Sequence, residues 1–217
     1  MPACNDCATE TATQGPDPRF ARVLWAALLA NALMFGVELT ASIIADSVSL
    51  LADAVDFFAD ATNYAISLFV VGMGLAARAR ASLVKGATMA AFGCWIIGNA
   101  IWRAMTGSEP DAAIMGSIAI LALAVNVAVA VMLYRYRQGD SNMRSIWLCS
   151  RNDAIGNIAV LLAAAGVFAS ASHWPDLLVA ALIASLNLHA AVHVIRMARS
   201  ELRADNARIA KRATGRM

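Results

Sequence analysis

Three aspartates lie within one largely apolar stretch of the chain, SVSLLADAVDFFADATNYAISLFVV, which runs from Ser47 to Val71. An aspartate at the centre of a lipid bilayer costs about 2.5–3.5 kcal/mol even on the lenient insertion scale. Asp56 and Asp60 are four residues apart, so on a helix they project from the same face, about one turn from each other. They can therefore share one ligand, whereas Asp53, three residues earlier and nearer the outer end, is expected to have a structural role.

A second pair with the same spacing, Cys149 and Asp153, lies in the stretch RSIWLCSRNDAIGNIAVLL. Each pair falls roughly ten residues from the start of its predicted helix, which puts both near the middle of the membrane. Facing each other, the pairs bring together three carboxylates and a thiol, which cannot all ionise in a low-dielectric site without protons or a cation. A divalent metal ion is the natural neutralising group, so we predict a metal site formed by Asp56, Asp60, Cys149 and Asp153.

Two other pairs of metal-ligating residue types are weaker candidates. Cys4 and Cys7 form a lone CxxC near the N-terminus, which is only half of a tetrahedral zinc site. His189 and His193 are four residues apart near the cytoplasmic end of the last apolar stretch. That spacing is compatible with metal binding, but packing at the membrane interface or contact with lipid headgroups is favoured.

Arg151 lies between Cys149 and Asp153 in the sequence. On a helix it points about 100° or more away from both, so it need not face the metal. Three alternatives stay open: it pairs with Asp53 or Glu38, lines a cytoplasmic aqueous cavity, or extends towards the membrane surface.

The composition indicates the kind of element that must position these side chains. Of 217 residues, 60% are hydrophobic and 15% are charged, with a mean hydropathy of +0.62, whereas soluble domains carry about 25% charged and 45–50% apolar residues. We therefore predict an all-α, polytopic integral membrane protein. Six apolar stretches are long enough to cross about 30 Å of hydrocarbon. They are Val23–Ile44, Val48–Leu75, Leu83–Met105, Ala112–Tyr134, Ile146–Ser170 and Trp174–Met197.

The basic residues predict the orientation of these helices. With a cytoplasmic N-terminus, 15 of the 17 Lys and Arg residues fall on inner flanks, so by the positive-inside rule both termini are cytoplasmic. The outer loops, such as GSEPD and SHWPD, are short and mildly acidic. We expect a flexible cytoplasmic tail over 1–18, a six-helix transport domain over 19–198, and a short basic cytoplasmic tail over 199–217.

Polar residues in membrane helices often serve only as hydrogen-bonding contacts between helices. The chain has five asparagines suited to that role: Asn31, Asn63, Asn126, Asn157 and Asn187. Acidic pairs differ, because intramembrane ionisable residues are functional by default.

Together, SVSLLADAVDFFAD after an ELTASIIAD run, and CSRNDAIGN in the fifth stretch, resemble the cation diffusion facilitator family of metal exporters. The resemblance implies six membrane helices with both termini cytoplasmic. It also implies a transport site built from D/H-x-x-x-D on the second helix and H/D-x-x-x-D on the fifth. Asp56, Asp60, Cys149 and Asp153 match these four positions, and Glu38 falls where many members carry a glutamate on the first helix.

The chain departs from the family pattern in two respects. Similar members usually carry a cytoplasmic, dimer-forming metal-binding domain after the sixth helix, whereas this chain ends twenty residues after Met197. We therefore expect a short member without that domain, whose homodimer depends on membrane helices. The fifth-helix ligand, usually His or Asp, is here Cys149, and the histidine-rich loop of some relatives is replaced by RYRQGDSNMRS.

The resemblance implies a secondary active exporter of Zn²⁺ and/or Cd²⁺, driven by proton antiport, in the inner cell membrane. Its partners are the metal ion, protons and the lipid bilayer, without nucleic acid. The metal is substrate, so we expect neither a resident cofactor nor an enzyme, and the chain has no GxxxxGK[ST] run for ATP. A non-transporting metal-sensing or accessory subunit remains the alternative. An intramembrane aspartyl protease is disfavoured, because the chain has no GxGD sequence.

Overall fold

The computed structural model describes residues 18–70, 75–136 and 141–214; within these ranges, the side chains of residues 18, 70, 75, 78, 141–152 and 208–214 are not described. The regular elements of the described residues are all helices, as predicted, and none is a strand. Its elements are α1 (Pro18–Ile44), α2 (Val48–Ala65), the π-helical segment η1 (Ile66–Val70), α3 (Leu75–Thr106), α4 (Ala112–Tyr134), α5 (Ser141–Ser170) and α6 (Trp174–Thr214). Five of the described helices are long and apolar enough to cross a membrane; the exception is α2, which carries the three aspartates.

The helix boundaries differ from the predicted apolar stretches mainly at one end of the bundle. Leu75, predicted to end the second helix, instead begins α3, and α6 continues beyond Met197 to Thr214. The start of α3 (LAARARAS) and the end of α6 (SELRADNARIAKRAT) are rich in Ala and Arg. Both residue types favour helix, and Arg lowers the hydropathy. Hydropathy therefore located the apolar parts of these helices and not their ends.

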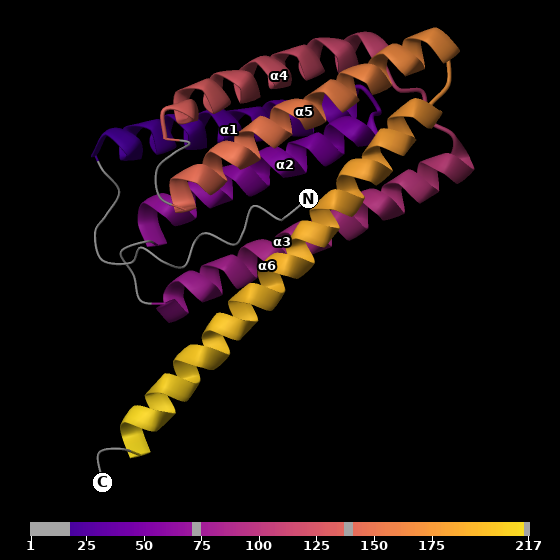
Figure 1. The fold of residues 1–217 in the computed structure, drawn as a ribbon. Coiled ribbons are helices and arrows are strands. Elements are labelled where there is room, and N and C mark those ends of the chain that lie inside the picture. The colour runs from indigo at the N-terminus through magenta and orange to yellow at the C-terminus, as the bar shows by residue number, and fades with distance from the viewer. Residues whose placement is uncertain (1–17, 71–74, 137–140, 215–217) are drawn as a thin grey trace.

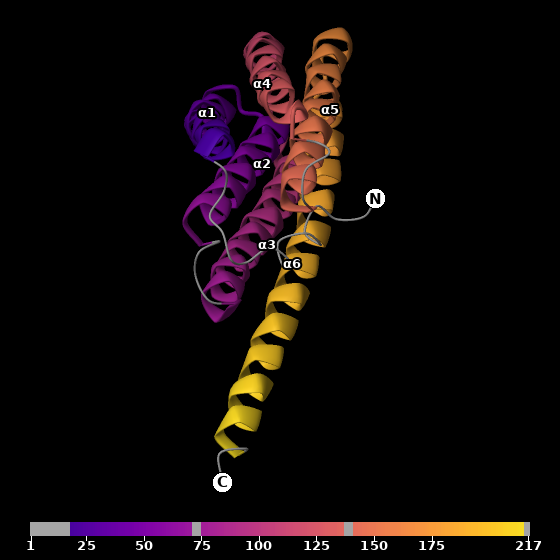
Figure 2. The same ribbon diagram turned by 60° about the vertical axis from the view of Figure 1, so that its left-hand side comes forward.

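The six helices divide into a four-helix group and a pair. Figure 1 shows α1, α2, α4 and α5 stacked side by side, with α3 and α6 crossing beneath them, and Figure 2 shows the same division after rotation. Within the group, α1 packs on α2 and α4 packs on α5. α2 is central, because it also contacts α3, α5 and α6. Its side chains are thus able to reach residues from both parts of the molecule.

Two glycines allow α3 and α6 to pack closely as a pair. A Cβ atom added at Gly86 would lie 2.8 Å from Cγ1 of Ile195, and one added at Gly93 would lie 2.8 Å from Cγ of Leu188. Small residues of this kind let helix backbones approach each other in a membrane. The two glycines are seven residues apart, so they lie on the same face of α3.

The helix ends gather at two ends of the bundle, which we call the basic end, where α1 begins and α6 ends, and the opposite end. At the opposite end, the buried carboxylate of Asp176, in the first turn of α6, caps the start of α2. It accepts hydrogen bonds from the Ser47 hydroxyl at 2.7 Å, the Val48 N–H at 2.8 Å, and the Ser49 N–H and hydroxyl at 3.0 and 2.6 Å. A carboxylate in this position satisfies free N–H groups and complements the helix dipole. It joins α6 to α2 at this end.

Candidate metal centre

The acidic residues of α2 lie on a helix that is surrounded by other helices along most of its length. Asp53 and Asp60 are buried, at 3% and 7% exposed, and Asp56 is half-buried. The cap formed by Ser47 and Asp176 starts the helix, and the aspartates then follow at a helical spacing. The sequence prediction that Asp56 and Asp60 share a helix therefore agrees with the structure.

Asp60 is the point at which α2, α3 and α5 meet through polar side chains. Its carboxyl group lies close to that of Asp153 on α5, and it accepts a hydrogen bond of 3.3 Å from the Tyr64 hydroxyl. The Lys85 ammonium group, on α3, lies near enough to attract it electrostatically. Two carboxyl groups from different helices, this close inside a membrane protein, need a proton or a cation between them.

Asp56 faces a different helix from Asp60. The Asn187 side chain of α6 approaches its carboxyl group. Among the described residues, no group of three or more His, Cys, Asp or Glu side chains comes close enough to hold a metal ion. The predicted fourth ligand, Cys149, lies on α5, but its side chain is outside the described residues. The structure therefore brings Asp60 and Asp153 together and leaves Asp56 turned towards α6.

A second buried polar network joins four helices nearer the opposite end. The Glu38 carboxyl group, on α1, is fully buried and lies close to that of Asp53. Asp53 accepts hydrogen bonds from the Asn157 amide of α5, one of them at 2.9 Å, once that amide is oriented to suit its neighbours. In this orientation the Asn157 oxygen accepts from the Asn126 amide of α4 at 2.7 Å.

This network gives Asp53 the interhelical structural role expected for it. Neither Glu38 oxygen has a hydrogen-bond donor among the residues described. Glu38 and Asp53 could form a hydrogen bond with each other only if one of the two carboxyl groups carried a proton. The expected role of asparagines as contacts between helices holds for Asn126 and Asn157. Asn31 differs, because its amide donates to the Ala27 carbonyl of its own helix at 2.8 Å.

Of the weaker candidate pairs, only the histidines have side chains in the described part of the chain. His189 is exposed and His193 is half-buried on α6. Cys4, Cys7 and the Arg151 side chain lie outside the described residues, so their roles stay predictions.

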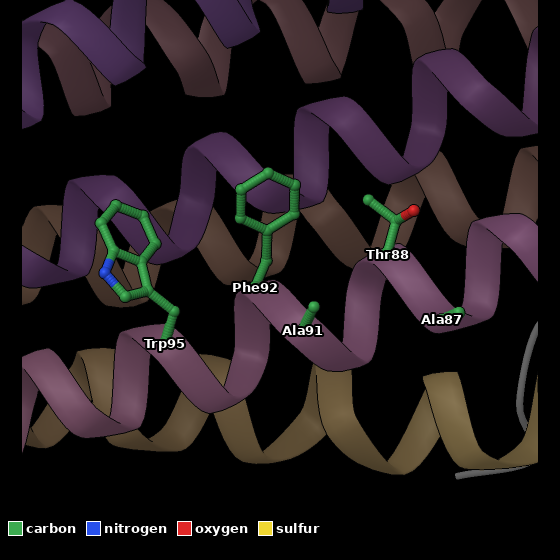
Figure 3. Close-up of a pocket in the computed structure, with 5 residues that line it drawn as sticks. All are labelled: Ala87, Thr88, Ala91, Phe92 and Trp95. Atoms are coloured by element: carbon green, nitrogen blue, oxygen red, sulfur yellow. The ribbon is translucent and has the colours of Figure 1, made fainter.

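An open groove lies along α3, apart from the acidic residues (Figure 3). It has a volume of about 640 Å³ and is lined by Ala87, Thr88, Ala91, Phe92 and Trp95. The Phe92 ring lies against Phe58 of α2 with 5.8 Å between ring centroids. All five lining residues come from one helix and none is charged, so the groove lacks the ligands that a metal site requires.

Lys85 and Asn187 are the site residues that sequence reasoning missed. Lys85 is one of the 15 basic residues that the positive-inside rule places on the inner flanks, yet it is only 5% exposed and is directed into the bundle. Asn187 was grouped with the other asparagines as a helix contact, without a link to Asp56. A polar residue within an apolar helix was the one sign in the sequence that each of them could matter. The sequence did not show which helices face α2, and so it did not identify their partners.

Comparison with known proteins confirms the family resemblance found in the sequence. Residues 24–203 match the family model described as the cation efflux transmembrane domain. That match covers most of the chain and includes all six helices in part or in full. A comparison with curated proteins found no match.

Proposed function

Because this chain belongs to the cation efflux family, and is thus a multi-pass membrane transporter of metal cations, we propose that it exports Zn²⁺ and/or Cd²⁺ by proton antiport across the inner cell membrane. Asp56, Asp60, Cys149 and Asp153 are the proposed ligands of the transported ion. The observation that best supports this site is the approach of the Asp60 and Asp153 carboxyl groups from two helices.

Transport follows from competition between metal and protons for the same lone pairs. With the site open to the cytoplasm, the carboxyl and thiol groups release their protons as Zn²⁺ binds to them. Asp56 turns from Asn187 towards Asp60 to complete the ligand set. When the helices rock and the site opens outward, protons from outside displace the metal, which couples export to the proton gradient.

The site is tested by metal transport in sealed vesicles containing only this protein. When a proton gradient is imposed, wild-type protein should move Zn²⁺ in the direction opposite to the proton flow, detected by a zinc-sensitive dye. Asp60→Asn should reduce transport to the background of empty vesicles, because it removes a charged ligand while keeping the size of the side chain and an acceptor for Tyr64. Glu109→Gln, which neutralises an exposed carboxylate outside the helices, is the matched control. Transport by Asp60→Asn at the wild-type rate would refute the proposed site.

We further expect a homodimer held through membrane helices, as in members that the chain resembles. Cross-linking in mild detergent should trap a two-chain species, and dilution into harsher detergent should dissociate it. A strictly monomeric particle that transports at the full rate would contradict this expectation.

A further inference from the structure

Lys85 places a positive charge where a metal transporter would be expected to keep only negative ligands. It lies on α3 and is 5% exposed. Its ammonium group donates to the Asn63 side-chain oxygen on α2 and is attracted by the Asp60 carboxylate. An ammonium group removed from water is costly unless it is paired with an opposite charge. Asp60 is a carboxylate of the proposed metal site, so the two charges compensate each other.

The packing of α3 explains why Lys85 turns inward. The adjacent residue, Gly86, is one of two glycines at which α3 approaches α6 closely, and an added Cβ there would meet Ile195 at 2.8 Å. Successive residues on a helix point about 100° apart, so Lys85 projects away from that seam towards α2. By contrast, Arg80, one turn and a half earlier, is exposed. Lys85 is therefore buried although another basic residue near the same end of α3 is exposed.

We propose that the Lys85 ammonium group is a tethered substitute cation for the metal site. It balances the Asp60 and Asp153 carboxyls when no metal is bound, and an arriving Zn²⁺ ion displaces it. This inference rests on the proposed function, since it takes Asp60 and Asp153 to be metal ligands. In this proposal the Lys85 ammonium group competes with the metal ion for the carboxylates. Because Lys85 is part of the protein, its local concentration is fixed.

Displacement of Lys85 has a consequence for the helices. Lys85 of α3 donates to Asn63 and lies near enough to Asp60 to attract it, and Asn187 of α6 approaches Asp56, so the α3–α6 pair places a polar side chain near each of the two α2 ligands. A bound metal takes both carboxylates and so weakens both interactions at once. Occupancy of the site thereby loosens the pair from α2, which links binding to movement of the pair.

The first test uses the unmodified protein. The chain has two lysines, Lys85 and Lys211, so labelling by an amine-reactive reagent, read by mass spectrometry, reports Lys85 with Lys211 as the internal reference. Zn²⁺ should raise labelling of Lys85 several-fold relative to Lys211, saturating as the site fills. Mg²⁺ should have no effect, because the thiolate-containing site disfavours hard ions. Labelling of Lys85 that stays constant or falls while Zn²⁺ binds would overturn the proposal.

The second test measures Zn²⁺ affinity by calorimetry in the wild type, in Asp60→Asn and in three variants of the basic residues of α3. Lys85→Met should tighten binding by about tenfold or more, because it removes a like charge close to the metal. Lys85→Arg, which keeps the charge, and Arg80→Met, which removes an exposed charge from the same helix, should stay near the wild-type value. Unchanged or weaker binding in Lys85→Met would show that Lys85 does not compete with the metal.

Asp60→Asn separates failure of this inference from failure of the proposed function. If wild-type protein binds Zn²⁺ and Asp60→Asn does not, the metal site stands whatever the outcome at Lys85. If Asp60→Asn binds Zn²⁺ like the wild type, the proposed site and this inference both fail. Should Lys85→Met not fold, the labelling experiment on the unmodified chain decides.

Discussion

Cys149 gives the proposed site a soft sulfur donor where relatives with this pattern carry His or Asp. A thiolate favours Zn²⁺ and especially Cd²⁺ over hard ions such as Mg²⁺, Ca²⁺ or Mn²⁺. Cys149→His should therefore retain Zn²⁺ transport and lower the Cd²⁺-to-Zn²⁺ ratio, whereas Cys149→Asp should weaken transport of both and admit harder ions. Competition among Zn²⁺, Cd²⁺ and Mn²⁺ in vesicles measures this. An unchanged Cd²⁺-to-Zn²⁺ ratio in Cys149→Ser would mean that the sulfur is not a ligand.

At the residue scale, spacing along one helix was predictable and contacts between helices were not. A separation of four residues placed Asp56 and Asp60 on one helix, and the matching pair motif led to Asp153 on another. The sequence did not show that Asn187 approaches Asp56 or that Lys85 donates to Asn63 beside Asp60. Both arrangements depend on how the α3–α6 pair packs against α2, which is a property of the tertiary structure. The role of Cys149 stays a prediction.

Among the helices, the start of α2 depends on a residue from the last helix of the chain. Asp176 is fully buried and accepts four hydrogen bonds from Ser47, Val48 and Ser49. Asp176→Ala should lower the free energy of unfolding by at least about 2 kcal/mol, because it leaves several buried donors without a partner. Unfolding in mixed detergent micelles, followed by circular dichroism, measures the loss.

A cap on a different helix provides the control for this prediction. Asp111 accepts hydrogen bonds from the Ala113 and Ile114 N–H groups at the start of α4, but it is exposed. Asp111→Ala should cost about 0.5–2 kcal/mol, the usual range for an N-cap, and less than Asp176→Ala. Equal losses in the two variants would show that burial of the Asp176 carboxylate adds nothing.

The same local signals explain which helices the sequence predicted well. The range Ala112–Tyr134 was predicted at both ends, because Asp111 caps its start and Arg135 interrupts the apolar run at its end. α3 and α6 were predicted too short, because their polar ends remain helical outside the apolar span. Hydropathy identifies the part of a helix that lies within the membrane. The full length of the helix also depends on helix propensity and capping.

For the whole molecule, the even number of helices places the first and last helix ends on the same side of the bundle. The start of α1 and the end of α6 lie at the same end of the bundle (Figure 1), and the basic residues predict that this end is cytoplasmic. In a chain with its four natural cysteines replaced by serine, Glu109→Cys should react with a membrane-impermeant maleimide in intact cells. Ser200→Cys should react only after the membrane is permeabilised. The reverse pattern of labelling would contradict the predicted orientation, with both termini cytoplasmic.

The cap at Asp176 and the length of α6 together give the molecule a mechanical lever. α6 has 41 residues, which at 1.5 Å per residue is a rod of roughly 60 Å. Asp176 holds one end of this rod against α2, and the other end projects beyond the remaining helices (Figure 2). For a rod of that length, a tilt of only about 5° about the held end moves the far end by roughly 5 Å. A change at the Asn187 contact, small in itself, is thereby magnified along α6 into a displacement as large as one helical turn.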